Sequence, residues 1–273
     1  QYDKVESICF DMINHLVNDC IVMGARPLAV QDAIICGKLE KEIVLRMVKA
    51  MSAACQAQGC SLTGGETSEQ PVVIPAGTYI LTSSIVGIVE KNQIIDGSKI
   101  EVGDTVLALE SSGLHTNGYT LIRKLLEQNP GLAHEAVGST TFIEAVLEPH
   151  RCYYAALKNL FSTGIITGLA HITGGGIKEN LNRILPKHLN AKIDLDLYQI
   201  LPIFNYLKKC TGLPDEELLR TFNMSVGMCM VVKKERTAEA MELVKSKGVN
   251  CYEIGGIIPG NGIVETIGEL TFI

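Results

Sequence analysis

Tryptophan is absent from this 273-residue sequence, and aromatic residues make up only 5% of it. A long hydrophobic run is also missing. The most apolar stretch, residues 80–89, contains three hydroxyl side chains and a glycine and falls far short of the roughly 20 residues that span a bilayer. Basic residues are in deficit, with 24 against 30 acidic ones and a formal net charge of −6. These absences argue against a membrane partner and against a nucleic-acid partner.

Paired cysteines are lacking as well. Nine cysteines are scattered along the chain, mostly in apolar segments such as MCMVV, and no two form a Cys-x-x-Cys pair. This pattern is typical of a reduced, cytosolic protein. Cys55 and Cys60 have no second pair or histidine cluster near them, so we expect buried thiols there and no zinc site. The opening residues, QYDKVES, do not resemble a signal peptide, and we expect a cytoplasmic location.

The sequence contains neither GxGxxG nor GxxxxGK[ST], the two common phosphate-binding fingerprints. It has instead two similar glycine-rich segments, SLTGGETSE (residues 61–69) and HITGGGIKE (residues 171–179). We expect each to be a tight turn, one in each half of the chain. A glycine turn ahead of a helix presents free N–H groups that suit phosphate, but it also suits a structural corner that needs positive φ. Both alternatives stay open on spacing alone.

The length favours two domains, and a polar stretch at residues 94–106 predicts a boundary near Gly97, which gives domains of residues 1–97 and 98–273. Hydrophobic periodicity predicts helices at 5–17 and 41–59 and a β-branched strand at 78–90 in the first half. In the second half it predicts strands at 105–110, 168–172, 191–196, 224–232 and 251–258, with helices at 117–129, 142–162, 177–185, 202–223 and 236–248. The expected fold class is α+β, close to α/β.

Acidic residues occur at the end of the first expected helix and in the first glycine-rich segment. Asn18 and Asp19 follow the first expected helix, and Glu66 follows the first glycine pair. Carboxylates repel a bound phosphate unless a cation lies between them, so these residues suggest Mg²⁺ held together with substrate phosphates. The alternative is that Asp19 and Glu66 only cap helices.

The histidine next to the glycine triplet is the other candidate for a functional residue. His171 directly precedes that turn, which places it above His15, His134 and His188 in ordinary helix or loop surroundings. A single histidine after an aliphatic strand is nevertheless more often a hydrogen-bonded structural residue.

Two further segments carry polar groups at expected element ends. HTNG, residues 115–118, either binds a polar substrate or forms a plain turn with an asparagine cap. The same two possibilities hold for Asn223 in RTFNMSVGM, residues 220–228.

Five segments together resemble the motifs of aminoimidazole ribonucleotide synthetases, also called phosphoribosylformylglycinamidine cyclo-ligases. They are VNDCIVMGARPL, GCSLTGGETSEQP, SSGLHTNGYTLIRK, HITGGGIKENLNRILP and RTFNMSVGM, in this order and spacing. The resemblance implies a two-domain ATP-binding fold, with a C-terminal sheet covered by helices. It also implies a homodimer whose N-terminal domains share a β-barrel, for which residues 78–90 are the candidate interface strand. The implied reaction is an ATP-dependent ring closure in purine biosynthesis.

The resemblance also implies roles for particular residues. His171 would be the acid–base catalyst, and Asp19 and Glu66 would hold Mg²⁺. The expected nucleotide-binding set is Asn18, Asp19, Gly64, Gly65 and Glu66. The expected substrate-binding set is Thr173, Gly174, Gly175, Gly176, His115, Asn117 and Asn223, with the triplet holding the ribonucleotide phosphate.

The sequence departs from the family pattern in several places. A glycine-rich segment, a lysine for ATP phosphates and a GTK strand precede the first helix in the family, whereas Gln1 corresponds to that helix. Three explanations stay open: the segment was removed, it was left out as disordered, or this chain is a degenerate paralogue that lacks it. Smaller departures include EPHRCYY in place of Pro-Thr-Arg. Two other functions stay open: another ATP-using enzyme of the thiamine phosphate or selenophosphate type, and a silent dimeric nucleotide-binding paralogue.

Overall fold

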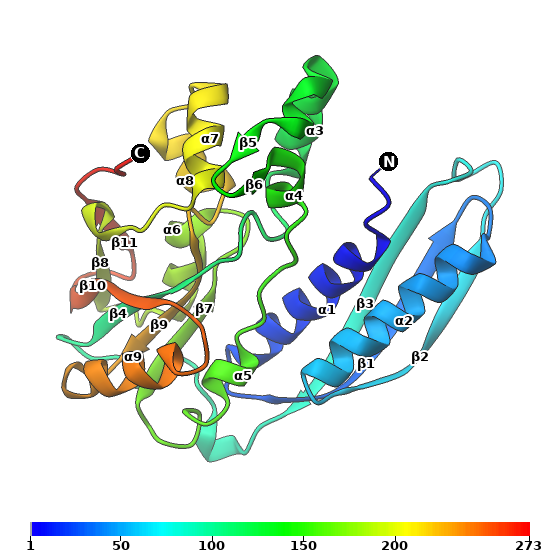
Figure 1. Ribbon diagram of the computed structural model, residues 1–273. Helices are drawn as coiled ribbons and strands as arrows, with labels where there is room; N and C mark the ends of the chain where they lie inside the picture. Colours follow the sequence, from blue (N-terminus) through cyan, green and yellow to red (C-terminus); the bar gives the residue numbers. More distant parts are fainter. Residues whose placement is uncertain (1) are drawn as a thin grey trace.

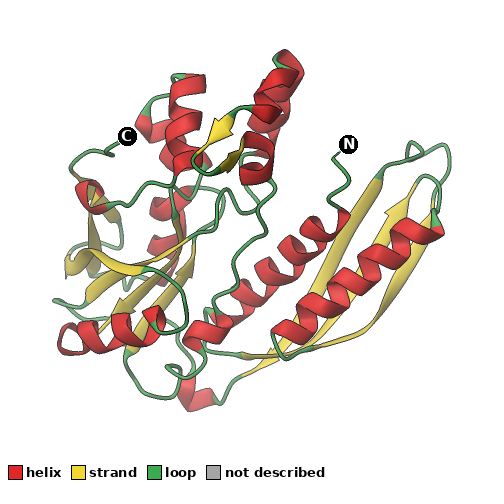
Figure 2. Ribbon diagram, in the orientation of Figure 1, coloured by secondary structure: helices red, strands yellow, loops and turns green. Residues whose placement is uncertain are grey.

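The computed structural model describes residues 2–273 and contains two open β-sheets, each with helices packed on it (Figure 1). The smaller sheet has three strands in the order β2-β1-β3, and the larger has six in the order β11-β8-β10-β4-β9-β7. A two-stranded ribbon, β5-β6, forms a separate small sheet. Helices and strands alternate along much of the chain (Figure 2), which confirms the α+β class expected from the sequence. No helix in the described part of the chain is both long and apolar enough to cross a membrane.

The three-stranded sheet belongs to the first 90 residues. Its strands are β1 (Arg26–Cys36), β2 (Ser61–Glu69) and β3 (Tyr79–Ile88), and its helices are α1 (Val5–Ile21) and α2 (Lys41–Ala57). Strand β1 lies in the centre, parallel to β2 and antiparallel to β3. Apolar residues recur every three or four positions in α1, so that Cys9, Ile13 and Val17 are fully buried. The two helices contact each other and cover the same face of the sheet, α1 against β3 and α2 against β2 (Figure 1).

Two expectations about this unit are wrong. The first helix continues to Ile21, so Asn18 and Asp19 lie within its last turn and not beyond its end. The segment SLTGGETSE is strand β2 and not a turn, and Glu66 therefore has no helix to cap. The glycines serve sheet geometry instead: Gly64, with φ of 143°, follows a register shift, and a Cβ on Gly65 would lie 2.4 Å from the carbonyl oxygen of Asp32.

The six-stranded sheet occupies the rest of the chain. Its strands are β4 (Thr105–Glu110), β7 (Ile166–His171), β8 (Leu189–Asp194), β9 (Val226–Val232), β10 (Cys251–Pro259) and β11 (Val264–Ile267). The ribbon consists of β5 (Ala136–Val137) and β6 (Thr140–Thr141). The helices are α3 (Tyr119–Gln128), α4 (Phe142–Val146), α5 (Tyr154–Leu157), α6 (Gly176–Leu181), α7 (Pro202–Thr211), α8 (Asp215–Thr221) and α9 (Thr237–Lys245). All five strands expected in this half are confirmed, whereas β11 was not expected.

Alternate residues of β4 show how the large sheet is buried on both faces. Val106 and Ala108 belong to a core with α3, α4, α6, α7 and α8. Leu107 and Leu109 belong to a second core, which contains α5, α9 and the buried residues of α1 and α2. Side chains of a strand point to opposite faces in turn, which places the two cores on opposite sides of the sheet. The second core is therefore shared by the two sheets.

Residues 147–153, between α4 and α5, run alongside α1 (Figure 1) and bond to polar side chains of that helix. Ser7 donates to the carbonyl oxygen of Leu147 at 2.6 Å, and Asn14 donates to that of His150 at 2.7 Å. Asp11 accepts from the backbone N–H of His150 at 2.7 Å. These bonds fix the position of His150 beside the first helix.

Candidate functional site

Four histidines from distant parts of the chain meet where α1 faces the end of β7. His15 comes from α1, His115 from the loop after β4, His150 from the segment along α1, and His171 from the last position of β7. The rings of His115 and His150 are stacked with centroids 3.9 Å apart, and those of His15 and His171 lie 5.0 Å apart, edge to face. His115, His150 and His171 are buried, whereas His15 lies closer to the surface.

Asp19 connects two of these rings. Its Oδ1 lies 2.7 Å from Nδ1 of His171, and its Oδ2 lies 3.1 Å from Nε2 of His15, one turn earlier in α1. An ionised carboxylate only accepts hydrogen bonds, so both of these ring nitrogens carry the proton. Partial burial acts to raise the pKa of Asp19, but the bonds from His15 and His171 outweigh it and lower that pKa well below its usual range. The carboxylate is therefore ionised and fixes the orientation of both rings.

The buried rings are neutral at physiological pH. Burial lowers the pKa of His171 despite the opposing effect of Asp19, because the charged form loses its hydration. Burial, and next the neighbouring His115 ring, lower the pKa of His150 well below its ordinary value. Since His171 is neutral and protonated on Nδ1, its Nε2 keeps a lone pair, and it can accept a proton there.

The glycine triplet is a turn, as expected, but its members differ. Gly175 and Gly176 have φ of 87° and 61°, and their N–H groups bond to the carbonyl oxygens of Arg220 and Thr173. Gly174 is exposed, has no positive φ, and has only Asn117 Oδ1, at 3.5 Å, near the position of an added Cβ. Gly174 is thus the member of the triplet that is open to a ligand.

Three polar side chains lie around Gly174, those of Asn117, Thr173 and Asn180. The buried Nδ2 of Asn117 has no hydrogen-bond partner within residues 2–273 and is free to donate. Thr173 donates to Oδ1 of Asn180 at 3.2 Å. Asn180 in turn donates to the carbonyl oxygens of Thr173, Gly174 and Gly176, the last at 2.8 Å, and so holds the turn in shape.

Other expected site residues have structural partners. Asn18, which is fully buried, donates to the carbonyl oxygen of Arg151 at 2.8 Å and accepts from the N–H of Tyr153 at 3.0 Å. Asn223 donates to the carbonyl oxygen of Gly113 at 2.9 Å and accepts from the N–H of Ser225. Their amides hold the loops of the site, so any role of these two side chains toward a ligand stays a prediction.

His115 is also committed to the protein. Its Nε2 lies 3.2 Å from the backbone nitrogen of Ser112 and 3.5 Å from that of Arg151, and its ring is fully buried. Its Nδ1 has no partner in the described part of the chain. His115 therefore stacks on His150 and anchors the backbone at Ser112 and Arg151.

The remaining expected nucleotide-binding residues lie elsewhere. Strand β2, at an edge of the three-stranded sheet, carries Gly64, Gly65 and Glu66. Asp19 lies at the histidine cluster, bonded to His171 at the end of β7. Among residues 2–273, no hydrogen bond or ion pair joins Glu66 to Asp19. Within one chain the structure does not bring the two expected Mg²⁺ ligands together.

Sequence reasoning missed His15 and His150. The spacing of His15 and Asp19, four residues apart on a helix, places both side chains on one face and was a usable signal. His150 had no comparable signal, because its partners lie 21 residues away in His171 and 136 away in Asn14. Only its place in EPHRCYY, where the family pattern differs, set it apart.

The class of protein to which this chain belongs follows from its similarity to known proteins. Family models for AIR synthase related proteins match residues 2–89 (N-terminal domain) and 101–268 (C-terminal domain). The crystal structure of thiamine-monophosphate kinase from Stenotrophomonas maltophilia is similar with a TM-score of 0.70 and 19% identity, covering 97% of this chain and 81% of that one. Hydrogenase maturation protein HypE in complex with ATP gives a TM-score of 0.72 at 20% identity, covering 97% and 79%. The fold is thus the two-domain fold of the AIR synthase superfamily.

Sequence similarity narrows the class. The phosphoribosylformylglycinamidine cyclo-ligase of Nitrosococcus oceani is 40% identical over 259 residues, which is 95% of this chain and 72% of that protein. The chain belongs to the AIR synthase family, on the branch of the phosphoribosylformylglycinamidine cyclo-ligases.

Proposed function

We propose that this chain catalyses the ATP-dependent cyclisation of formylglycinamidine ribonucleotide to aminoimidazole ribonucleotide, releasing ADP and phosphate. One observation carries the proposal: a neutral, carboxylate-oriented histidine lies directly before an open glycine turn, in a chain 40% identical to a cyclo-ligase. In this reaction ATP phosphorylates the formyl oxygen, the amidine nitrogen attacks the activated carbon, and phosphate leaves.

The phosphate of the ribonucleotide is assigned to the Gly174 side of the turn. The free Nδ2 of Asn117 and the uncrowded backbone at Gly174 are the groups that support this assignment. Gly175 and Gly176 act indirectly, because their N–H groups are used inside the protein and their φ values shape the turn. Thr173 and Asn180 keep that shape before substrate binds.

His171 is assigned to proton transfer at the reacting nitrogen. Its lowered pKa leaves Nε2 unprotonated, so we propose that it acts as the base that removes a proton from the amidine. Asp19 would hold the ring in the required tautomer and stabilise it once it is protonated. Acceptance of the proton by Nε2 requires His150 to turn away from its 3.0 Å contact with that atom.

Asp19 also fits a cation of the Mg²⁺ type. Its side chain is 53% exposed and ionised, and each carboxylate oxygen retains a lone pair beyond the hydrogen bond it accepts from histidine. When bound, Mg²⁺ supplies charge neutralisation for the phosphates of ATP. Glu66, exposed on β2, carries the second expected carboxylate.

We propose that two copies of the chain complete the ATP site. The face of the three-stranded sheet that α1 and α2 leave uncovered bears Ile80, Val86 and Ile88, which are 47%, 62% and 51% exposed. An apolar sheet face of this kind favours association with a second sheet. A homodimer, with a barrel shared between two such sheets, would bring β2 of one copy toward the site of the other. The ligand of that site would be a small nucleotide.

The test is an assay of the full-length gene product with formylglycinamidine ribonucleotide, ATP and Mg²⁺, with aminoimidazole ribonucleotide and phosphate as the products measured. Thiamine monophosphate and selenide are offered to the same preparation. We expect product from the ribonucleotide alone. Product from another substrate, or ATP binding without any turnover, would contradict the proposal.

Two variants test the division of labour. His171→Ala should lower turnover by roughly 10²–10⁴-fold, the usual contribution of a general base, while ATP affinity stays nearly intact. Asp19→Ala should weaken Mg²⁺-dependent ATP binding, measured by calorimetric titration. His188→Ala removes an exposed histidine outside the site and serves as the control. The reverse pattern in the two site variants would overturn the assignment.

A further inference from the structure

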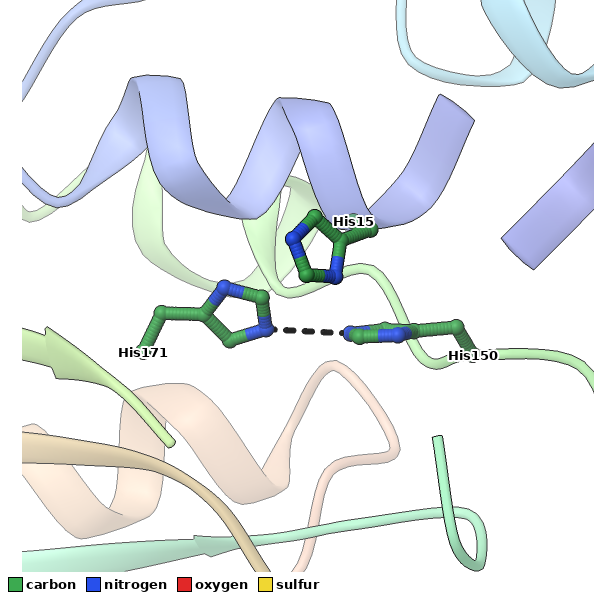
Figure 3. A group of neighbouring side chains, drawn as sticks. All are labelled: His15, His150 and His171. Atoms are coloured by element: carbon green, nitrogen blue, oxygen red, sulfur yellow. Dashed lines mark hydrogen bonds between the residues drawn. The ribbon is translucent and has the colours of Figure 1, made fainter. Parts of the chain in front are cut away.

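Three imidazole rings converge on one point in a way that the cyclisation does not require. One nitrogen from each of His15, His150 and His171 lies within 4.8 Å of the other two, and Figure 3 shows the rings grouped around a common gap. Nε2 of His150 and Nε2 of His171 face each other at 3.0 Å. Zinc–nitrogen bonds of about 2.0–2.1 Å in a tetrahedral site place two ligand nitrogens roughly 3.3–3.4 Å apart, a spacing close to that of the His150–His171 pair, and His15 needs to move by at most about 1.5 Å to reach it.

The hydrogen bonds identify which nitrogen of each ring is available. Asp19 accepts from Nδ1 of His171 and from Nε2 of His15, which leaves the lone pairs of His171 Nε2 and His15 Nδ1. His15 Nδ1 has only the exposed hydroxyl of Thr116 as a partner, at 2.9 Å.

His150 completes the set. Its buried Nδ1 has no partner among residues 2–273, while its Nε2 contacts His171, whose Nε2 is an acceptor. A proton shift to Nδ1 would free a third lone pair at the common point, and a metal ion would replace the hydrogen bond that Nε2 makes to His171.

We propose that His15, His150 and His171 bind one divalent transition-metal ion of the zinc type. Three neutral imidazoles suit Zn²⁺, Ni²⁺ or Co²⁺ and do not suit Mg²⁺, which prefers oxygen ligands. Asp19 provides the outer-shell carboxylate that commonly orients a metal-binding histidine, and here it orients two. The fourth position is open to water on the side where His15 and Asp19 are 30% and 53% exposed, which is also the path of entry.

The ion would also affect the proposed reaction. Metal bound to Nε2 of His171 uses the lone pair that the base requires, so loading the site should inhibit cyclisation. This consequence rests on the proposed function, whereas metal binding does not. The two are separated by measuring binding without ATP or ribonucleotide.

The experiment uses full-length, untagged protein that has been treated with a chelator and dialysed. Co²⁺ is titrated while visible absorption is followed, because a four-coordinate cobalt site absorbs far more strongly than the hydrated ion, and Zn²⁺ is then added as a competitor. We expect one Co²⁺ per chain, displaced by one Zn²⁺. His15→Asn alters a partly exposed ligand and should weaken binding by at least about tenfold, and Asp19→Asn should weaken it by about 10–100-fold. Thermal unfolding checks that the variants fold.

His188→Asn removes an exposed histidine that is not part of the cluster and should bind the metal like the unmodified protein. The proposal is overturned if the unmodified protein shows no four-coordinate cobalt spectrum, or if folded His15→Asn binds as tightly as the His188→Asn control. If binding occurs while Zn²⁺ leaves the reaction rate unchanged, the metal site stands and the base assignment of His171 fails.

Discussion

At the scale of residues, the glycines of HITGGG show that one sequence pattern can serve separate purposes. A Cβ on Gly176 would lie 1.8 Å from the carbonyl oxygen of Leu219, and Gly175 has φ of 87° at the start of α6. Both positions need glycine for the fold itself. Gly174 has neither requirement, which supports the proposal that a ligand approaches its backbone.

Substitution by alanine should separate these purposes. Gly176→Ala combines positive φ with a backbone clash and should lower the free energy of unfolding by roughly 2–5 kcal/mol in denaturant titrations. Gly174→Ala should leave stability within about 0.5 kcal/mol but weaken binding of the ribonucleotide in calorimetric titration.

Gly164→Ala is the matched control, because Gly164 has φ of 71° and nothing within 4 Å of an added Cβ. It should cost about 1–2 kcal/mol from backbone strain alone. If Gly174→Ala bound the ribonucleotide normally, the phosphate would not lie at the turn.

At the scale of elements, the hydrophobic pattern predicted the helices α2 and α3, which bury one side, and the short apolar strands β4 and β9, which are buried on both faces. It failed where polar or glycine residues lie inside an element. The end of α1 was placed too early because Asn18 is polar, yet its amide is buried against the backbone of Arg151 and Tyr153. Strand β2 was missed because its glycines fit a bulged pair with β1.

The candidate site was likewise predictable only where its residues are neighbours in the sequence. His171 could be found from its place next to the glycines, whereas the partner Asp19 is 152 residues away and the pairing depends on how α1 packs on the second unit. Local sequence carries no information on such a contact, which is why His150 was overlooked, whereas the spacing of His15 and Asp19 was a local signal that was not used.

Helices α1 and α2 are linked by an ion pair whose contribution depends on pH. Arg46 donates to both carboxylate oxygens of Glu6, at 2.6 and 2.9 Å, and this lowers the pKa of Glu6 from 4.5 to about 2. A lowered carboxyl pKa stabilises the folded state above the unfolded value, and that stabilisation is lost as pH falls from 4.5 toward 2.

Arg46→Met should therefore destabilise the protein at pH 7, and the difference from the unmodified protein should shrink between pH 4.5 and 2 in chemical unfolding. Lys49→Met changes an exposed lysine of the same helix and should show no such pH dependence. A difference that stayed constant with pH would mean that Arg46 acts through packing of its alkyl chain and not through its charge.

At the scale of the whole molecule, the uncovered sheet face determines the expected assembly. Residues of β3 alternate, so Leu81 and Ile85 pack toward the helices while Ile80, Val86 and Ile88 face outward. Val86→Glu would place a charge on this face, between Ile80 and Ile88 of β3, and should convert a dimer to monomers in sedimentation experiments.

Val102→Glu is the control, since Val102 is 58% exposed in the loop before β4 and away from this face. It should leave the mass unchanged. If the unmodified protein is monomeric, or if Val86→Glu remains dimeric, the sheet face is not the interface.

The core shared by the two sheets bears on what a domain means in this protein. The family model for the N-terminal domain ends at residue 89, and that for the C-terminal domain begins at residue 101. We propose a domain boundary between them, near Gly97. Yet Gly97 lies so close to the backbone of Ile184 that a Cβ would meet its carbonyl oxygen at 2.0 Å, and α1 shares one apolar cluster with β4 and α9. Separating the halves would expose that cluster in both. Each unit therefore covers apolar surface of the other, and the histidine site at their junction needs residues from both.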